Sequence, residues 1–255
     1  MRLSTAAFFL LSPVFALAQG SNGLSEATES TARPVARVYA ETAYTLQIAK
    51  SLRKDETKDV CVMSGGSGFI LQDNGSNYLV TAAHVVLGST TKGTIIKDGK
   101  EKSYTLGETA SLTQTKTRIR VGTLSLVPER LLVDPAADVA IMTLADADLR
   151  TLNLLSFGMH RARLRPEIQV RVWGFPSTVL PQFTDSPRVS AVEDDFFVLN
   201  QPIDSGFSGG PVLDAAGELI GSVVRTTEKQ TRCVTTRAIL RAVASFAATA
   251  KPYHD

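Results

Sequence analysis

Residues 204–213 read Asp-Ser-Gly-Phe-Ser-Gly-Gly-Pro-Val-Leu and place Ser208 within a run of glycines. An apolar, strand-like run follows this serine almost at once. Glycines let the backbone turn sharply, so the pattern predicts an exposed hydroxyl with backbone amides beside it. A nucleophilic serine needs both features, because the oxyanion that its attack creates must be stabilised nearby. Ser208 is therefore the candidate nucleophile.

The candidate base is His84, which ends the segment Thr81-Ala82-Ala83-His84. The small alanines before it would let the imidazole ring sit in a cleft. The two other histidines fit less well, since His160 lies in a polar stretch and His254 is the penultimate residue. A lone histidine is usually structural, but a suitable serine elsewhere in the same chain favours a catalytic role for His84.

The candidate acid is Asp138, which opens the apolar run Val-Ala-Ile-Met and should lie at a strand edge against the core. Asp134 competes with it, but Asp134 precedes a proline and is typical of a turn. A partly buried carboxylate can hold the imidazole tautomer and stabilise the imidazolium. The chain order is therefore His84, Asp138, Ser208, and the pattern predicts a serine protease.

Residues 206–210 also match G-x-S-x-G, the nucleophile elbow of α/β-hydrolases. That elbow requires a helix after the serine, whereas residues 211–213 are strand-like. It also requires an acid and then a histidine downstream, and only the terminal His254 follows. This pattern excludes an esterase or lipase of that class.

Strand patterns dominate the chain from residue 67 onward. Residues 68–71 and 78–81, joined by a turn at 73–77 that contains Asn74-Gly75, predict a β-hairpin. Many short strands with few helical periods favour an all-β barrel or sandwich. Further strand candidates are 94–97, 117–121, 139–144, 168–173, 196–199, 210–213 and 219–224.

One helix is predicted, over 236–250, with Ile239, Val243 and Phe246 forming an apolar stripe and Arg237 and Arg241 lying off it. Residues 34–60 fit either a short helix or a strand, and the sequence leaves that segment open.

The first eighteen residues predict an export signal, with Arg2, an apolar stretch and the cleavage motif Ala16-Leu17-Ala18. We expect a mature protein in the periplasm or the medium, without a membrane span. Residues 19–59 are expected to form an N-terminal extension, partly mobile, and 60–255 the catalytic domain. The formal net charge of +2 and the scattered basic residues give no sign of a nucleic-acid partner.

Only two cysteines are present, Cys61 and Cys233. Export would allow a disulfide between them, although two separate buried thiols fit the sequence as well. No metal or cofactor is expected.

Taken together, these segments resemble the trypsin-like (chymotrypsin-fold) serine proteases, closest to bacterial HtrA/Deg-like or glutamyl-endopeptidase-like members. The resemblance spans about residues 60–245. It rests on Gly66-Ser67-Gly68-Phe69, Thr81-Ala82-Ala83-His84, Asp138-Val139-Ala140, Gly174-Phe175-Pro176 and Gly206-Phe207-Ser208-Gly209-Gly210-Pro211.

The resemblance implies two antiparallel six-stranded β-barrels with the active site between them and a C-terminal helix. It also implies an oxyanion hole made by the backbone N–H groups of Gly206 and Ser208. An extended substrate would pair with the strand that carries Ser222, Val223 and Val224. The substrates would be proteins or peptides.

The sequence departs from this family in two places. Phe207 stands where digestive members carry an aspartate that pairs with a new N-terminus, so activation of that kind is not expected. The 255 residues also leave no room for a PDZ domain beside the catalytic domain, so none is expected in this chain. The favoured function is thus an exported serine endopeptidase. The alternative is a catalytically silent peptide- or protein-binding module on the same scaffold.

Overall fold

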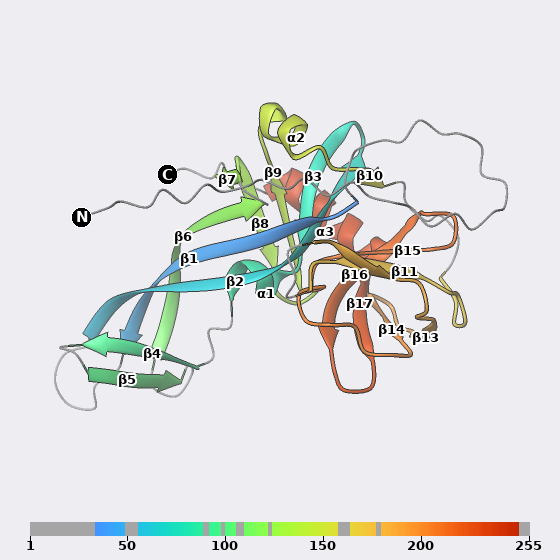
Figure 1. Cartoon of the computed structure of the whole chain (residues 1–255). Coiled ribbons are helices and arrows are strands. Elements are labelled where there is room, and N and C mark those ends of the chain that lie inside the picture. Colours follow the sequence, from blue (N-terminus) through green and yellow to red (C-terminus); the bar gives the residue numbers. More distant parts are fainter. Residues whose placement is uncertain are drawn as a thin grey trace, which may run out of the picture. The chain divides into compact units, whose positions relative to one another are not determined.

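The computed structural model describes residues 34–48, 56–88, 92–97, 100–105, 110–121, 124–157, 164–176 and 180–249. Strands dominate these residues and form two large sheets and one two-stranded sheet (Figure 1). The predicted export signal, residues 1–18, lies outside the described residues. The predicted all-β class with a C-terminal helix is confirmed.

The first sheet has the strand order β7-β6-β1-β2-β3-β9-β8, and β10 joins it by pairing parallel to β2. All other pairs in this sheet are antiparallel. Its strands are β1 (Ala36–Ile48), β2 (Glu56–Asp73), β3 (Ser76–Thr81), β6 (Ala110–Val121), β7 (Leu124–Leu126), β8 (Arg130–Asp134), β9 (Val139–Thr143) and β10 (Ser156–Phe157).

The second sheet is antiparallel with the order β12-β11-β15-β16-β17-β14-β13. Its strands are β11 (Arg171–Gly174), β12 (Gln182–Thr184), β13 (Val189–Val192), β14 (Phe196–Leu199), β15 (Pro211–Leu213), β16 (Leu219–Thr226) and β17 (Thr231–Thr235). A separate pair consists of β4 (Lys92–Lys97) and β5 (Lys100–Thr105). Each large sheet curls into a half-barrel and holds more strands than the six expected, because short segments such as β7, β10 and β12 pair at its edges.

The predicted hairpin is confirmed in β2 and β3, where Asp73 pairs with Ser76 across a two-residue turn. The turn residues Asn74 and Gly75 have φ angles of 48° and 79°. Positive φ at both positions is the geometry that matches the twist of a tight hairpin, and Asn-Gly adopts it at low cost. This hairpin leads the chain directly toward His84.

The segment that the sequence left open contains a long strand, β1, which pairs with both β2 and β6 (Figure 1). Val38, Ala40 and Thr42 are buried, and the alternation with period two is that of a strand with one face on the core. The first sheet therefore begins well before residue 60, the boundary expected for the catalytic domain. Residues 36–48 belong to that sheet and not to a separate extension.

Three hydrophobic clusters hold the described chain together. One cluster consists mainly of side chains from the first sheet, such as Val38 and Leu79. Another consists mainly of side chains from the second sheet, such as Val172 and Phe197. The third joins both sheets to the C-terminal helix through residues that include Phe69 and Leu219. Because this third cluster contains residues of both sheets, it packs the two sheets against each other.

The described residues include three helices: α1 (Ala83–Leu87), α2 (Asp146–Leu152) and α3 (Thr236–Thr249). The predicted apolar stripe of α3 is confirmed, since Ile239, Val243 and Phe246 are almost fully buried. Burying each such side chain contributes roughly 1.5–3 kcal/mol. Among the described residues no helix has the length and apolar content that a bilayer crossing requires.

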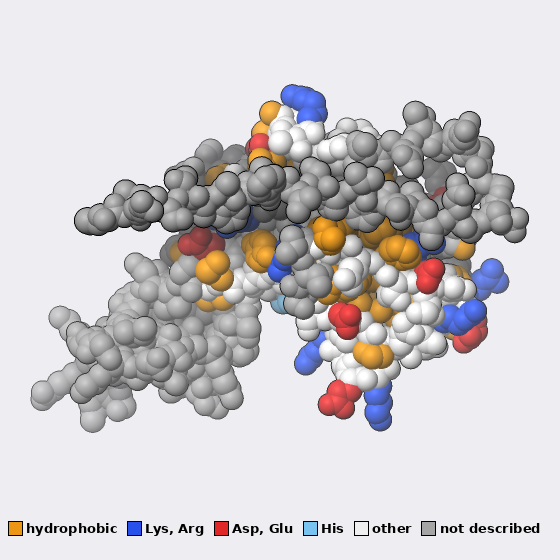
Figure 2. Space-filling view, in the orientation of Figure 1, with side chains coloured by type: hydrophobic (Ala, Val, Ile, Leu, Met, Phe, Trp, Pro, Cys, Tyr) orange, Lys and Arg blue, Asp and Glu red, His pale blue; other side chains and the backbone are white. Residues whose placement is uncertain are grey.

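Both signs of charge occur on the face of the molecule drawn in Figure 2, where Lys and Arg side chains lie interspersed with Asp and Glu. Several charged side chains of the described residues pair locally, such as Arg232 with Glu193 at 3.3 Å. Exposed pairs of this kind contribute little to stability.

Candidate active site

The loop that carries Ser208 is shaped by glycines that no other residue can replace without strain. Gly206 and Gly209 have φ angles of 95° and 82°, in the region that residues with a side chain rarely adopt. A Cβ on Gly206 would lie 2.1 Å from the carbonyl oxygen of Phe175, and one on Gly209 would lie 2.3 Å from that of Ser67. The loop is thus pressed against two neighbouring backbone segments.

Phe207 lies between Gly206 and Ser208 and points into the second core, where it is 4% exposed. Its ring fills the space over Gly174, where a Cβ would come within 2.4 Å of it. The nucleophile loop is therefore anchored by the apolar packing of Phe207.

His84 lies on α1, the short helix that follows β3. The helix buries Val85 and Val86 in the first core and leaves the His84 side chain 46% exposed. The backbone N–H of Gly88 donates to the carbonyl of His84 at 2.9 Å and ends the helix. Because i and i+1 side chains of a helix point apart, burial of Val85 turns the imidazole toward the solvent-filled cleft.

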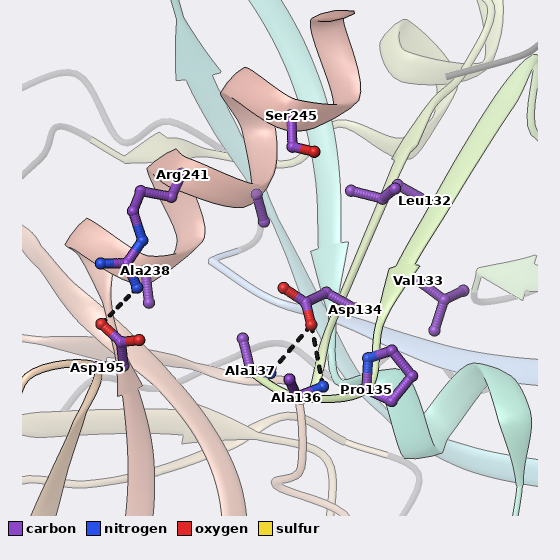
Figure 3. Close-up of a pocket in the computed structure, with 11 residues that line it drawn as sticks. Leu132, Val133, Asp134, Pro135, Ala136, Ala137, Asp195, Ala238, Arg241 and Ser245 are labelled. Atoms are coloured by element: carbon purple, nitrogen blue, oxygen red, sulfur yellow. Dashed lines mark hydrogen bonds and ion pairs between the residues drawn. The ribbon is translucent and has the colours of Figure 1, made fainter. Parts of the chain in front are cut away.

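Asp138 ends the turn between β8 and β9, and Asp134 builds that turn. The Asp134 carboxylate accepts the backbone N–H groups of Ala136 at 3.0 Å and Ala137 at 3.2 Å (Figure 3). Asp138 then has a φ of 53°, a conformation that Asp tolerates better than most residues. Asp134 therefore shapes the turn, and Asp138 is the residue that faces His84.

Asp138 contacts His84 at two points. One carboxylate oxygen, Oδ1, accepts the backbone N–H of His84 at 2.9 Å, and Oδ2 lies 2.8 Å from the ring atom Nδ1. A carboxylate only accepts, so the proton between them is on Nδ1. Nε2 is left as the basic nitrogen, directed away from Asp138.

A cavity of about 470 Å³ opens beside this pair. His84, Asp138 and Ser208 all line it, together with Asp204, Ser205, Gly206, Val224, Arg225 and Thr226. The three residues that the sequence singled out are therefore brought to one cleft, although they are up to 124 positions apart (208 minus 84). In the described part of the chain, no hydrogen bond joins the Ser208 hydroxyl to His84.

Two backbone N–H groups at the cleft, those of Gly206 and Ser208, have no hydrogen-bond partner among the described residues. Their neighbours in the loop are paired: Phe207 donates to Asp204 at 3.4 Å, and Gly209 donates to Val223 at 2.8 Å. Unpaired amides are rare in native proteins unless water or a ligand satisfies them. The amides predicted to bind an oxyanion are thus the ones available to do so.

The strand expected to pair with a substrate is β16, and of the three residues expected there, Ser222, Val223 and Val224, Val224 lines the cleft. Ser222 and Val223 are buried, and both backbone groups of Val223 are already bonded, to Gly209 and Gly210. Val224, which is also buried, lines the cleft together with Arg225 and Thr226, the two exposed residues of the strand. The pairing of β16 with β17 shifts its register between Val223 and Arg225.

The structure contradicts a Cys61–Cys233 disulfide. Cys233 is a free thiol, fully buried in the second core on β17, whereas Cys61 lies on β2 of the first sheet. Burial raises the pKa of the Cys233 thiol well above its ordinary range. Separate sheets hold the two residues, and the alternative of an unpaired buried thiol applies to Cys233.

The family comparison decides the class of protein. Residues 66–221 match the model of the trypsin-like peptidase domain, which is more than half of the chain. The chain belongs to the trypsin-like peptidase family. The match begins within β2 and ends on β16, so it includes strands of both sheets and all three candidate residues of the cleft.

Solved structures of similar fold agree with this family. The active form of the Rv3671c protease from M. tuberculosis has 18% sequence identity and a TM-score of 0.55, with 86% of this chain and 83% of that chain covered. The inactive form of the same protease has 16% sequence identity and a TM-score of 0.50, with 80% of this chain and 87% of that chain covered. At this identity the likeness shows the fold, which is chymotrypsin-like. No curated protein sequence matches the chain.

Asp204 and Arg225 place one charge of each sign in the lining of the cleft. Ser67 entered the sequence analysis only as part of the motif Gly66-Ser67-Gly68-Phe69, and the structure shows it bonded to the nucleophile loop. Its position between glycines before a buried strand was the available signal, but only the fold brings it to Ser208.

Proposed function

We propose that this member of the trypsin-like peptidase family is a serine endopeptidase with Ser208 as nucleophile, His84 as general base and acid, and Asp138 as the residue that orients His84. The observation that carries the proposal is the bidentate contact of Asp138 with His84 beside a cleft that Ser208 and two unpaired amides also line. This combination has the three elements that acyl transfer requires.

The reaction follows from this geometry. Nε2 of His84 takes the hydroxyl proton as the Ser208 Oγ bonds to the carbonyl carbon of the scissile peptide. The N–H groups of Gly206 and Ser208 donate to the resulting oxyanion. His84 then gives the proton to the leaving amine, the C–N bond breaks, and an acyl-enzyme remains. Water hydrolyses this ester with His84 acting as base again.

The substrate is proposed to be an extended peptide that lies along the end of β16. Val224, Arg225 and Thr226 are the residues of that strand that line the cleft. Backbone groups on an open strand edge bind any extended peptide, so they supply affinity without selecting side chains. Neither a metal nor an organic cofactor takes part in these steps.

The test is hydrolysis of an unspecific protein substrate such as casein by the purified mature chain. We expect cleavage that is lost in Ser208→Ala while the thermal unfolding curve stays that of the wild type. Ser190→Ala, which removes an exposed hydroxyl on β13, is the matched control and should keep full activity. A folded wild type that binds peptides but releases no product would instead support the binding module.

We further propose that the protein is exported and that cleavage follows Ala18. The proposal rests on Arg2, the apolar stretch after it and the Ala16-Leu17-Ala18 motif. N-terminal sequencing of the secreted or periplasmic chain should start at Gln19. A chain that keeps Met1 and stays in the cytoplasm would contradict it.

A further inference from the structure

Ser67 is a fully buried serine on β2 that makes four hydrogen bonds, three of them to segments of the second half of the chain. Two of them reach the nucleophile loop. Its backbone N–H donates to the carbonyl of Ser208 at 2.7 Å, and its hydroxyl donates to the carbonyl of Gly206, also at 2.7 Å. Ser67 thus connects the sheet that carries His84 to the loop that carries Ser208.

The direction of the hydroxyl proton is fixed by its partners. The backbone N–H of Phe175 lies 2.9 Å from Ser67 Oγ and can only donate, so the oxygen must accept there. The Gly206 carbonyl can only accept, so the single hydroxyl proton must point to it. Thr81 in turn donates to the carbonyl of Ser67 at 2.7 Å and holds the serine backbone in place.

These bonds clamp the peptide groups on both sides of the Ser208 amide. The Gly206–Phe207 peptide is held through its carbonyl by the Ser67 hydroxyl. The Ser208–Gly209 peptide is held through its carbonyl by the Ser67 N–H and through its N–H by Val223. Between them lies the Phe207–Ser208 peptide, whose N–H is unpaired. With both flanking groups fixed, that N–H has little freedom to turn away from the cleft.

The same clamp acts on the second amide donor. Gly206 lacks a Cβ and has a φ of 95°, so its backbone has the torsional freedom to let its N–H rotate out of the cleft. The Gly206 N–H belongs to the Ser205–Gly206 peptide, and the bond from the Ser67 hydroxyl fixes the peptide that follows it, at the Gly206 carbonyl. Ser67 therefore restrains Gly206 on one side only, and it acts on this N–H less directly than on that of Ser208.

We propose that Ser67 is a positioning residue that keeps the Gly206 and Ser208 amides directed at the oxyanion, through its hydroxyl bond to Gly206. The inference rests on the proposed serine endopeptidase function. Preorganised donors act because they need no reorientation when charge develops, so their loss affects the transition state more than substrate binding.

The test is Ser67→Ala, assayed by steady-state hydrolysis of a casein-derived fluorogenic peptide and by the rate at which a fluorophosphonate modifies Ser208. Losing one oriented donor should lower kcat about tenfold to a hundredfold, and the rate of modification similarly, with KM nearly unchanged. Ser67→Cys keeps the shape of the side chain and a weak donor, although sulfur is larger than oxygen, and should give an intermediate loss. This variant also covers the case in which the alanine variant does not fold.

Thr236→Val is the matched control, because Thr236 is also buried and donates its hydroxyl to a backbone carbonyl, that of Leu219, at 2.9 Å. It does not line the cleft and should keep kcat. Wild-type rates in folded Ser67→Ala or Ser67→Cys, an effect on KM alone, or an equal loss of kcat in Thr236→Val would overturn the inference. A wild type that neither cleaves nor reacts would refute the proposed function itself.

Discussion

Asp138 binds His84 through both the backbone and the ring, with its two carboxylate oxygens at 2.9 Å from the backbone nitrogen and 2.8 Å from Nδ1. The contact with the backbone N–H fixes the position of the His84 main chain, and the contact with Nδ1 fixes the orientation of its imidazole ring. The turn built by Asp134 holds the carboxylate in this position. The position of the basic Nε2 of His84 is therefore set by Asp138 and by the turn between β8 and β9 that Asp134 builds.

Asp138→Asn tests this relationship. The backbone N–H of His84 can still donate to the amide oxygen, which turns the amide NH₂ toward Nδ1. Nδ1 must then accept, the ring proton moves to Nε2, and Nε2 can no longer take the serine proton. We expect kcat to fall about 10³- to 10⁴-fold with the fold unchanged. Steady-state kinetics and thermal unfolding check this, and near-normal kcat in the variant would contradict it.

Gly209→Ala tests the close packing of the nucleophile loop. Its Cβ would lie 2.3 Å from Ser67 O and 2.4 Å from Thr81 Oγ1 at a φ of 82°. We expect a loss of roughly 3 kcal/mol or more in the free energy of unfolding, together with loss of activity.

Gly217→Ala is the matched control for that substitution. Gly217 has nearly the same φ, 80°, but no atom within 4 Å of the added Cβ. Gly217→Ala should lower the free energy of unfolding by only about 1–2 kcal/mol and leave kcat unchanged. Equal costs in the two variants, measured by chemical denaturation, would mean that backbone conformation and not packing dominates at Gly209.

The sequence predicted most of the cleft because local chemistry decides those positions. Ser208 among glycines, Asp138 before an apolar strand and His84 after one each carry a local signal, and all three line one cavity. The hairpin at Asn74-Gly75 and the buried stripe of α3 are confirmed for the same reason.

What the sequence could not supply depends on pairing across the fold. The strand character of β1 comes from its two neighbours, β2 and β6, more than from its own residues. Which residues of β16 line the cleft depends on how the strand lies against the nucleophile loop, since Val223 is bonded to that loop and Thr226 lines the cavity. The role inferred for Ser67 likewise depends on a partner 139 positions away.

The ion pair of Asp195 with Arg241 predicts a pH-dependent contribution to stability. A hydrogen bond from Arg241 is the main cause that lowers the pKa of Asp195, and burial opposes it. A carboxyl whose pKa is lower in the folded chain stabilises the fold at pH values above its ordinary pKa, and this stabilisation is lost as the pH falls through the lowered pKa.

Asp195→Asn should therefore lower Tm at neutral pH, and the difference from the wild type should shrink toward about pH 3 and below. Asp194→Asn is the neighbouring control, since the Asp194 side chain is fully exposed and its contact with Arg237 is longer, at 3.5 Å. A Tm difference for Asp195→Asn that stays constant from neutral to acidic pH would show that the pair does not contribute through charge.

The two charged residues at the edge of the cleft predict opposite effects on substrate choice. Arg225 should favour peptides with acidic side chains near the scissile bond, and Asp204 should favour basic ones. Arg225→Gln should lower kcat/KM for acidic peptides, and Asp204→Asn for basic peptides, each by about twofold to fivefold at low salt. Identical changes for both peptide classes would show that neither charge faces the substrate.

The most direct test of the central claim is to treat the folded mature chain with a fluorophosphonate and locate the adduct by peptide mass spectrometry. The reagent requires an activated serine beside an oxyanion site and no knowledge of the natural substrate. We predict modification of Ser208 in the wild type, and none at that position in Ser208→Ala or His84→Ala. A folded wild type that stays unmodified, or that is modified at Ser208 equally well without His84, would contradict the account.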